Sequence, residues 1–536
     1  MTLSLKEQAQ MYYDDQGKLH FSPITAVINP KTSFSKVNES ELTGKEVSAT
    51  RPNAAIDKKI SKLTELTQLA QSSCELWHDE NQEPYASFNV AGHFEHWSID
   101  SKGFKDWLSR QAFIKKMGSV SKEVMADTCA TLGGLAKYEG ATHATGWRVM
   151  KHDGAYWIDI ANDTWQAIKI SSAGWQIVDN PPVRFLRNKN FRPLPTSISG
   201  GKVTDLFELI NVPKEDELLV LAWMMECYRP DTQYPILELN GEQGSAKSTT
   251  QRVLRLFIDN NKVMLRARPK AIEDIYVAVS NGHLISYENL SGLSADMSDA
   301  LCVVSTGGGY AARTLYTNTE ETTLSAKNPV IINGINRVIT RPDLLDRAIT
   351  ISCPLIKQRI DEIEHQKMVE ALAPTIFGAL LDLFVKALQI LPTVSIDPEK
   401  LPRMTAFTYL GEAMSQALGK KDEDYFVDKY VELRREAVAG TIDATPLGRA
   451  LLGFVECGHS HIGTVGNLLA RLNAFEHKAS VEPGDFWPKS PRKLGDELRR
   501  LAPALRQIGI DCTVDSKPKR DGIHCAVQKK QQSSPR

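Results

Sequence analysis

A short loop that ends in lysine offers the clearest chemistry in this sequence. Residues 234–250, YPILELNGEQGSAKSTT, pass from an apolar run through Gly241 and Gly244 to Lys247 and Ser248. Glycines let the backbone curl so that its N–H groups face phosphate oxygens, and a following helix N-terminus adds its dipole. Lys247 would reach the β- and γ-phosphates, and the Ser248 hydroxyl would bind Mg²⁺. The predicted nucleotide-binding residues are Gly241, Glu242, Gln243, Gly244, Ser245, Ala246, Lys247, Ser248 and Thr249.

The residues on either side of the loop must supply a strand and a helix. An apolar, strand-like run at 236–239 precedes it, and apolar residues at helical spacing follow at 253–257. Ala246 departs from the pattern G-x-x-x-x-G-K-[ST], which has glycine before the lysine. A methyl group is tolerable there if that residue keeps a negative φ. The alternative, an ordinary turn rich in glycine and serine, is disfavoured by both flanks and by the Lys-Ser pair.

Two later apolar strands end in polar side chains. The segment HLISYEN ends in Glu288 and Asn289, and PVIIN ends in Asn333. In phosphate-loop NTPases such strands place an acid beside Mg²⁺ and a polar sensor near the γ-phosphate. The roughly forty residues between Lys247 and Glu288 fit one helix and one strand of an open parallel sheet.

Two arginines precede a further strand in the segment RPDLLDR. Arg341 or Arg347 could stabilise charge on the phosphoryl group transferred in a neighbouring subunit. Either could instead pair with Asp343 or Asp346 in its own chain. Between the second and third strands, Arg313, Tyr316 and Lys327 follow or flank a run of three glycines. They are candidates for contact with a nucleic-acid backbone, and a plain surface hairpin is the alternative.

The C-terminal segment is locally basic. Residues 487–536 hold twelve Lys and Arg against five Asp and Glu. Ser490 can cap a helix whose apolar face carries Leu494, Leu498 and Leu501. Four basic residues fall off that face and are candidate DNA contacts: Arg492, Lys493, Arg499 and Arg500. Helix, helix and a basic two-strand tip predict a winged helix, and a solvated basic helix is the alternative.

Composition limits the remaining possibilities. The chain has 536 residues, 64 Lys and Arg against 65 Asp and Glu, and eight cysteines without a C-x-x-C pair. Net charge therefore predicts no partner, and the cysteines fit a reducing compartment rather than a zinc module. Neither a leader sequence nor a run of about 18 apolar residues is evident, so we expect a cytoplasmic protein without a membrane partner.

The order of segments predicts an α/β protein of several domains. Four tryptophans fall in one alternating stretch, where a packed meander is expected and a base-stacking face with Arg148, Lys151 and Lys169 is the alternative. The expected parts are an arm or linker at 1–59, a helical domain at 60–140, a β-meander at 141–195, a phosphate-loop core at 196–360, a helical lid at 361–445 and a winged-helix-like basic domain at 446–536.

Taken in order, GEQGSAKST, LISYEN, TGGGYAARTLY, VIING and RPDLLDR resemble the ATPase module of superfamily 3 helicases. They more closely resemble phage- and island-borne ATP-binding proteins related to phage and poxvirus primase-helicases. The resemblance extends from about Trp147 to about Arg506. It implies an AAA+ fold, a parallel sheet flanked by helices, assembled into a ring that is usually a hexamer. ATP then lies between subunits, and DNA lies in the central channel.

Residue by residue, the resemblance implies that Lys247 and Ser248 hold ATP and Mg²⁺, with Glu288 as the acid. Asn333 matches the polar sensor, and Arg347, with Arg341 second, matches the arginine that acts in trans. The loop around Arg313 and Tyr316 matches the hairpin that follows DNA. Asn289 stands where many relatives carry a second acid. With Glu288 as the single acid, ATP turnover would be slow.

Together these features predict a ring-forming, ATP-dependent helicase or translocase for single-stranded or forked DNA, serving replication of a phage, plasmid or genomic island. The alternative is an ATP-gated DNA-binding switch or defence sensor that does not unwind DNA. The first 230 residues offer no convincing acidic primase motif, so any primase would be a separate partner.

Overall fold

A computed structural model describes residues 12–13, 19–20, 61–313, 321–420, 422, 424–443, 445–479 and 487–530, with the side chains of 12–13, 19–20, 310–325 and 476–479 outside the description. The chain divides into two compact units, Met1–Lys59 and Ile60–Arg536. In the first unit β1 (Tyr12–Tyr13) pairs antiparallel with β2 (Leu19–His20). The rest of the arm predicted at 1–59 lies outside the described residues.

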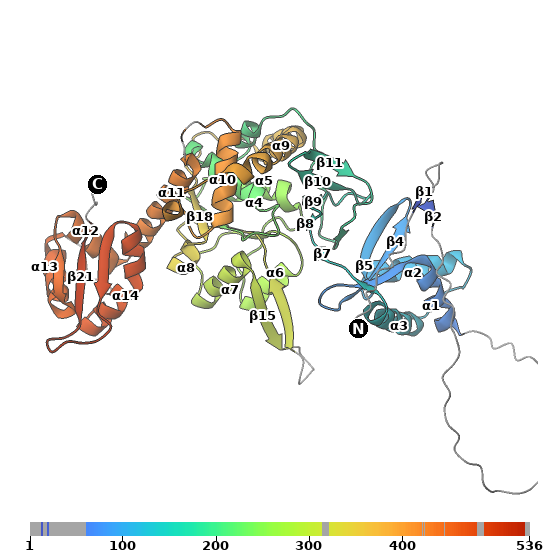
Figure 1. The fold of residues 1–536 in the computed structure, drawn as a ribbon, viewed down its shortest axis with the longest axis horizontal. Helices are drawn as coiled ribbons and strands as arrows, with labels where there is room; N and C mark the ends of the chain where they lie inside the picture. Colours follow the sequence, from blue (N-terminus) through green and yellow to red (C-terminus); the bar gives the residue numbers. More distant parts are fainter. Residues whose placement is uncertain are drawn as a thin grey trace, which may run out of the picture. The chain divides into compact units, whose positions relative to one another are not determined.

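The first part of the second unit contains the helices predicted for 60–140, but it also contains a sheet that the prediction of a mainly helical domain did not include. The sheet has the order β5-β4-β3-β6 and lies beside three helices (Figure 1), with which its apolar side chains share one core. Strand β4 starts with five consecutive buried residues, so it lacks the alternation that marks a strand in sequence. The elements are α1 (Lys62–Ser73), β3 (Glu75–His78), β4 (Pro84–Val90), β5 (His93–Ser98), α2 (Lys102–Ile114), α3 (Lys122–Tyr138) and β6 (Ala141–Thr142).

The tryptophan-rich stretch forms the expected meander of short antiparallel strands, in the order β11-β10-β9-β8. Trp157 is buried, Trp175 donates a hydrogen bond to Asp382 at 2.7 Å, and Trp147 stacks on Phe191. These three tryptophans therefore pack the meander against its surroundings. The strands are β7 (Thr145–Gly146), β8 (Val149–His152), β9 (Ala155–Asp159), β10 (Ala167–Ser171), β11 (Gly174–Val178) and β12 (Arg184–Phe185), of which β7 and β12 pair in parallel.

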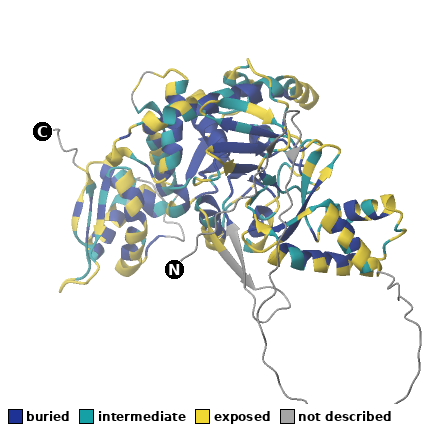
Figure 2. Cartoon of the chain, turned by 45° about the vertical axis from the view of Figure 1, so that its right-hand side comes forward, coloured by how far each residue is buried: buried dark blue, intermediate teal, exposed yellow. Residues whose placement is uncertain are grey.

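A four-stranded parallel sheet in the order β14-β17-β13-β18 lies at the centre of the second unit. Nearly every residue of these strands is buried, as expected for a sheet covered by helices on both faces (Figure 2). The elements are η1 (Val203–Glu208), η2 (Lys214–Asp216), α4 (Glu217–Glu226), β13 (Ile236–Asn240), α5 (Lys247–Asp259), α6 (Ile272–Val279), β14 (Ile285–Tyr287), α7 (Ala295–Thr306), β15 (Gly308–Arg313), β16 (Glu321–Ala326), β17 (Val330–Asn333), α8 (Pro342–Leu345) and β18 (Ala348–Ser352).

The strand expected between the lysine loop and Glu288 is reduced to a single bridge. Arg266 bridges Tyr287 in parallel, with Arg266 N–H donating to Ser286 O at 2.8 Å. Pro269 follows three residues later and lacks the N–H that a longer ladder would need, which helps to explain why the pairing stops.

Beyond the sheet the chain is helical and then mixed. The helices are α9 (Glu362–Ile390), α10 (Thr405–Ala417) and α11 (Tyr425–Asp443), with η3 (Leu391–Thr393) and η4 (Pro398–Lys400) between the first two. One described helix, Glu362–Thr393, is long and apolar enough to cross a membrane, but 61% of its most apolar window is buried, which marks a core helix.

The last part contains α12 (Pro446–Glu456), β19 (His461–Thr464), α13 (Val465–Ala479), α14 (Pro491–Gln507), β20 (Ile510–Val514) and β21 (His524–Lys529), with the sheet order β19-β21-β20. Ser490 caps α14 by accepting a hydrogen bond from Lys493 N–H, and Leu494, Leu498 and Leu501 are buried, as the sequence predicts. Strand β19 was not predicted.

Candidate nucleotide-binding site

The loop between β13 and α5 is curled at two glycines. Gly241 has φ 144° and Gly244 has φ 92°, both in the region that favours glycine. A Cβ atom on Gly241 would lie 2.6 Å from the carbonyl oxygen of Cys353, so the turn also requires a residue without a side chain.

Lys247, the first residue of α5, reaches back over this loop. Its Nζ donates to the carbonyl oxygens of Gly241 at 2.7 Å and Glu242 at 2.8 Å, and to Ser245 Oγ at 3.1 Å. The side chain is buried, and this burial lowers the pKa of the ammonium. All three partners are neutral, and no carboxylate among the described residues pairs with the ammonium, so its positive charge is left for an anion.

Ala246 adopts the left-handed conformation, with φ 51° and ψ 27°. The condition under which a methyl group would be tolerable here, a negative φ, is therefore not met. The chain must turn sharply from the loop into α5 at this residue, and the methyl group makes that turn strained for an L-amino acid.

Two predicted residues, Glu288 and Asn333, lie at the same edge of the parallel sheet. Register pairs Leu239 with Asn333, and Glu288 directly follows the last residue of β14. The carboxyl ends of β13, β17 and β14 therefore meet there, beside the lysine loop. Glu288 is partly exposed and its N–H donates to Arg266 O at 2.9 Å, whereas Asn333 is fully buried.

Gln251 connects these strand ends to α5, and the sequence did not single it out. Its Nε2 donates to Ser286 Oγ at 2.7 Å and Tyr287 O at 3.0 Å, and its Oε1 accepts from Asn333 Nδ2 at 2.5 Å. Asn333 Oδ1 accepts from the N–H of Asn289 at 2.9 Å. The amides thus fix the geometry of the edge. The sequence could have indicated this role, because Gln251 follows Lys247 by one helical turn and therefore lies on the same face of the helix.

A second residue missed by the sequence is Arg359. A Cβ atom placed on Gly244 would lie 3.2 Å from Arg359 Nη2, so this guanidinium extends over the loop. It comes from the segment after β18, more than a hundred residues away in the chain. It adds a second cation above the curled backbone.

A cavity of about 800 Å³ opens beside the loop. Ala246 and Thr249 line one side, and Asn211, Ile360 and His365 line others. Asn211 also holds the loop itself, because its Nδ2 donates to Ser245 O at 2.9 Å.

The two candidate arginines lie at the opposite edge of the sheet. Ala348 pairs with Ile236 at the start of β13, so Arg347 precedes β18 at the amino ends of the strands. A strand of five residues spans roughly 16 Å, which separates Arg347 from the loop of its own chain. Arg341 forms ion pairs with Asp299 at 2.9 Å and with Asp343 at 3.3 Å.

Arg347 makes no ion pair among the described residues. Its Nη1 donates to Asp343 O at 2.5 Å, and its Nε is buried without a partner. Asp346, the other acid considered for pairing, binds Arg434 at 2.7 Å instead. Of the two arginines, Arg347 keeps its charge uncompensated.

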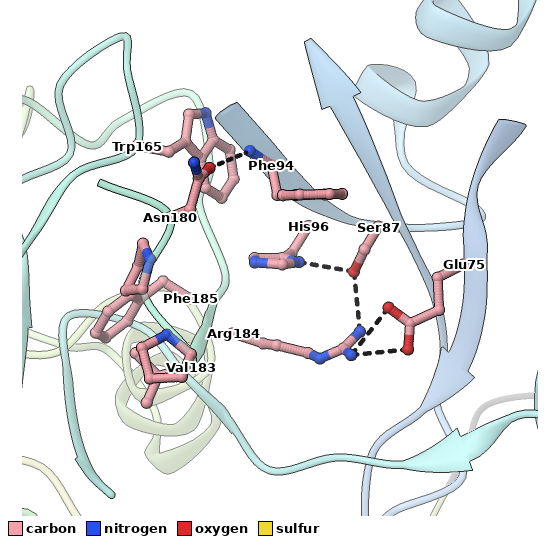
Figure 3. Close-up of a pocket in the computed structure, with 11 residues that line it drawn as sticks. Glu75, Ser87, Phe94, His96, Trp165, Asn180, Val183, Arg184 and Phe185 are labelled. Carbon is pink, nitrogen blue, oxygen red and sulfur yellow. Dashed lines mark hydrogen bonds and ion pairs between the residues drawn. The ribbon is translucent and has the colours of Figure 1, made fainter. Parts of the chain in front are cut away.

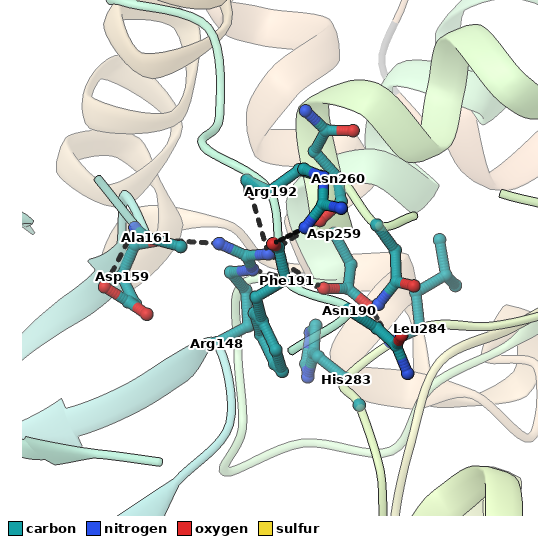
Figure 4. A network of polar contacts seen from close by, with 12 residues as sticks. Arg148, Asp159, Ala161, Asn190, Phe191, Arg192, Asp259, Asn260, His283 and Leu284 are labelled. Carbon is teal, nitrogen blue, oxygen red and sulfur yellow. Dashed lines mark hydrogen bonds and ion pairs between the residues drawn. The ribbon is translucent and has the colours of Figure 1, made fainter. Parts of the chain in front are cut away.

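The far end of α5 is fixed to the meander by a buried ion pair. Arg148 and Asp259 are both fully buried, with their charged atoms 3.1 Å apart, and Arg148 also donates to Asp159 O and Asn260 O (Figure 4). Burial alone would raise the pKa of Asp259, but Arg148 and Arg255 outweigh it and hold that pKa below its usual value. Arg148 therefore cannot face nucleic acid, which contradicts the stacking alternative at this residue.

The predicted DNA contacts are only partly described. Tyr316 and the Arg313 side chain lie outside the described residues, and Lys327 is half-buried with its pKa lowered by burial. On α14, Arg499 pairs with Asp496 at 3.1 Å and Arg500 with Glu497 at 2.6 Å. Arg492 and Lys493 are exposed.

Two family models match the chain. The model described as "Actinomycete integrative conjugative element replication protein" matches residues 203–427, and the one described as "AICE RepA C-terminal domain" matches residues 447–534. Together they cover more than half of the sequence. The chain belongs to this replication-protein family. In this chain the first model covers the lysine loop and both candidate arginines, and the second covers α14. Among curated proteins, none matches the chain.

Solved structures give a broader similarity. One described as "SCCmec type IV Cch - active helicase" is 12% identical, with 85% of this chain and 92% of that chain covered and a TM-score of 0.43. Another, described as "The A form apo structure of NrS-1 C terminal region-CTR", is 12% identical, with 88% of this chain and 100% of that chain covered and a TM-score of 0.37.

Proposed function

We propose that this replication protein is an ATP-driven DNA helicase or translocase that acts in replication of an integrative conjugative element. The observation that carries the proposal is Lys247, a buried ammonium held over a curled loop by neutral oxygens alone. A phosphate-binding loop requires this arrangement, because backbone N–H groups and one lysine must meet the β- and γ-phosphates. Membership of the family supports the link to replication.

The residues at the sheet edge fit Mg²⁺, which prefers oxygen ligands. The Ser248 hydroxyl and the Glu288 carboxylate would hold the ion, which when bound neutralises charge on the phosphates. Asn333, which binds both Gln251 and the N–H of Asn289, keeps the edge in place for the attacking water. The 800 Å³ cavity takes the nucleoside, and Arg359 contacts the phosphates within the same chain.

Arg347 fits a role on the nucleotide of a neighbouring copy. It lies at the edge away from its own loop and has no carboxylate partner among the described residues. A head-to-tail contact between copies would bring it to the next loop, and such contacts form a ring when the rotation between copies closes. In this proposal the ring is a hexamer around DNA. The order of α12, β19, α13, α14, β20 and β21 fits a winged helix that offers α14 to DNA.

The test is ATP hydrolysis with and without single-stranded DNA, followed by strand displacement on a tailed duplex. We expect DNA-stimulated turnover that disappears in Lys247→Ala. Arg347→Ala subunits mixed in rising proportion with wild type should lower turnover more than proportionally. Arg341→Ala is the matched control and should reduce turnover only in proportion. Turnover that ignores DNA, together with proportional inhibition by Arg347→Ala, would contradict the motor.

A nucleotide-gated DNA-binding switch is the second candidate. Two observations favour it: Ala246 is strained next to Lys247, and the residue after Glu288 at the strand end is Asn289 and not a second acid. A switch would bind DNA more tightly with ATP and would displace no strand. The duplex assay separates the two functions.

A further inference from the structure

A second cavity, of about 270 Å³, lies between strands β3 to β5 and the turn before β12. It is far from the lysine loop in sequence and shares no lining residue with the larger cavity. Phe94, Trp165 and Phe185 supply aromatic walls, and His96 lies between them (Figure 3). Phe94 is 48% exposed, so a ring could stack on it without any rearrangement of the core.

The hydrogen-bond pattern fixes which nitrogen of His96 carries a proton. Ser87 Oγ accepts from Trp77 Nε1 at 2.8 Å and from Arg184 Nη1 at 2.9 Å, which uses both of its lone pairs. Its own proton must then go to His96 Nδ1, 2.7 Å away. Burial, with the nearby charges of Arg184 and Arg187, lowers the pKa of His96 to about 3, so the ring is neutral at pH 7.

The remaining proton of a neutral His96 is therefore on Nε2. In Figure 3 this nitrogen points away from Ser87, into the space between Trp165 and Phe185. Among the described residues none accepts a hydrogen bond from it. The cavity thus presents one fixed donor between aromatic walls.

The ion pair between Arg184 and Glu75 at the wall of the cavity disfavours charged ligands. Arg184 is bound by both oxygens of Glu75, at 2.8 and 3.0 Å, so its charge is already compensated. An anion would have to displace that carboxylate, and a cation would lie beside a guanidinium. The cavity suits a flat, neutral ring that stacks on aromatic side chains and accepts one hydrogen bond.

We propose that this cavity binds one unpaired nucleobase of single-stranded DNA. Every base has a face for stacking and an edge with acceptors, which is the chemistry that Phe94 and the Nε2 of His96 offer. The proposal goes beyond the ATPase and depends on the proposed function only in taking DNA as the source of the base. It gives the meander and the first sheet a shared role in holding the strand.

The test is ultraviolet cross-linking of the full chain to a single-stranded oligothymidine that carries one 5-iodouracil. The buffer contains EDTA and no ATP, so the result does not depend on hydrolysis. Mass spectrometry should find the cross-link on peptides that carry Phe94, His96 or Trp165. Cross-links confined to other peptides would overturn the proposal.

The second part of the test measures the affinity of the chain for the same oligonucleotide by fluorescence anisotropy. Phe94→Ala should weaken binding about tenfold, the loss expected for one stacked base, and Phe94→Tyr should restore it. Phe113→Ala is the control, because Phe113 is 78% exposed on the same domain and lies outside the cavity. Equal binding by Phe94→Ala and Phe113→Ala would overturn the proposal.

Free 5-iodouridine distinguishes the two sources of a base. Labelling of the cavity by the oligonucleotide supports a DNA strand. Labelling by the nucleoside but not by the oligonucleotide would overturn the assignment to DNA. A chain that hydrolyses no ATP yet gives the cross-link would contradict the proposed motor and leave the base site standing.

Discussion

At the scale of single residues, the lysine loop combines a strained alanine with an ammonium that has no carboxylate partner in the part of the chain that the structure describes. Ala246 has a φ of 51°, a conformation that costs an L-residue about 1–2 kcal/mol. The strain is local to the turn into α5. A glycine would remove it, at the cost of a more flexible unfolded chain.

We predict that Ala246→Gly raises the free energy of unfolding by up to about 1 kcal/mol, measured by urea denaturation. Ala130→Gly is the control, since Ala130 is exposed within the regular helix α3. That change should lower stability by about 1 kcal/mol. If both substitutions lowered stability equally, the left-handed assignment of Ala246 would be wrong.

A second prediction concerns the buried amide of Gln251. Gln251→Leu removes its bonds to Ser286, Tyr287 and Asn333 and leaves their polar groups buried without partners. Each such group costs about 1–3 kcal/mol, so the variant should be destabilised by at least that amount in urea. Gln366→Leu changes an exposed glutamine on α9 and should fall within about 0.5 kcal/mol of wild type. Equal effects would contradict the amide network.

At the scale of elements, α5 is held at both ends. The lysine loop lies at its N-terminus, and the ion pair between Arg148 and Asp259 ties its last turn to the meander. Breaking a buried pair on one side leaves an uncompensated charge, which typically costs about 3–5 kcal/mol.

Asp259→Asn should therefore lower stability by about 3–5 kcal/mol at pH 7. The folded pKa of Asp259 lies below its unfolded value of about 3.9, so the pair contributes fully above that value. The contribution is lost as the pH falls through the folded pKa. Urea denaturation at pH 7 and in steps below pH 4 should show the difference between wild type and variant narrowing. A constant difference would mean that Asp259 does not carry the charge.

Helix α14 gives a prediction about DNA. Arg492 and Lys493 are exposed, whereas Arg500 is paired with Glu497. Each phosphate contact adds about 0.9 to the slope of log binding constant against log salt. Replacing Arg492 and Lys493 together by alanine should lower that slope by about 2, measured by anisotropy over a salt series. Arg500→Ala should leave the slope nearly unchanged. A fall in the slope equal to that of the double variant would show that an ion pair on α14 does not keep an arginine from binding DNA.

The sequence predicts contiguous features well at this scale. The loop, the strands that end in Glu288 and Asn333, and the cap at Ser490 each depend on neighbours in the chain. Gln251 and Arg359 escaped notice because their roles come from contacts with strands and a loop that are distant in sequence. The sheet of β3 to β5 was not predicted because buried and exposed residues do not alternate along β4. The strand predicted before Glu288 is only a single bridge at Arg266, close to Pro269.

At the scale of the whole molecule, Asp346 joins three parts. Its Oδ1 accepts from Arg434 of α11 at 2.7 Å and from Gln507 of α14 at 3.1 Å, and the next residue is Arg347. The lid and the C-terminal domain therefore both contact the corner that positions the candidate trans arginine. If α14 binds DNA as proposed, the hydrogen bond between Gln507 of α14 and Asp346 would connect the bound DNA to that corner.

The position of Arg347 at the amino ends of the strands also has a consequence for mass action. If each active site borrows this side chain from another copy, an isolated chain is an incomplete enzyme. ATP turnover per chain should then rise with protein concentration and level off once assembly is complete. Turnover per chain measured over a dilution series, beside sedimentation of the same samples, tests this. Constant turnover in samples that sediment as monomers would mean that one chain holds a complete site.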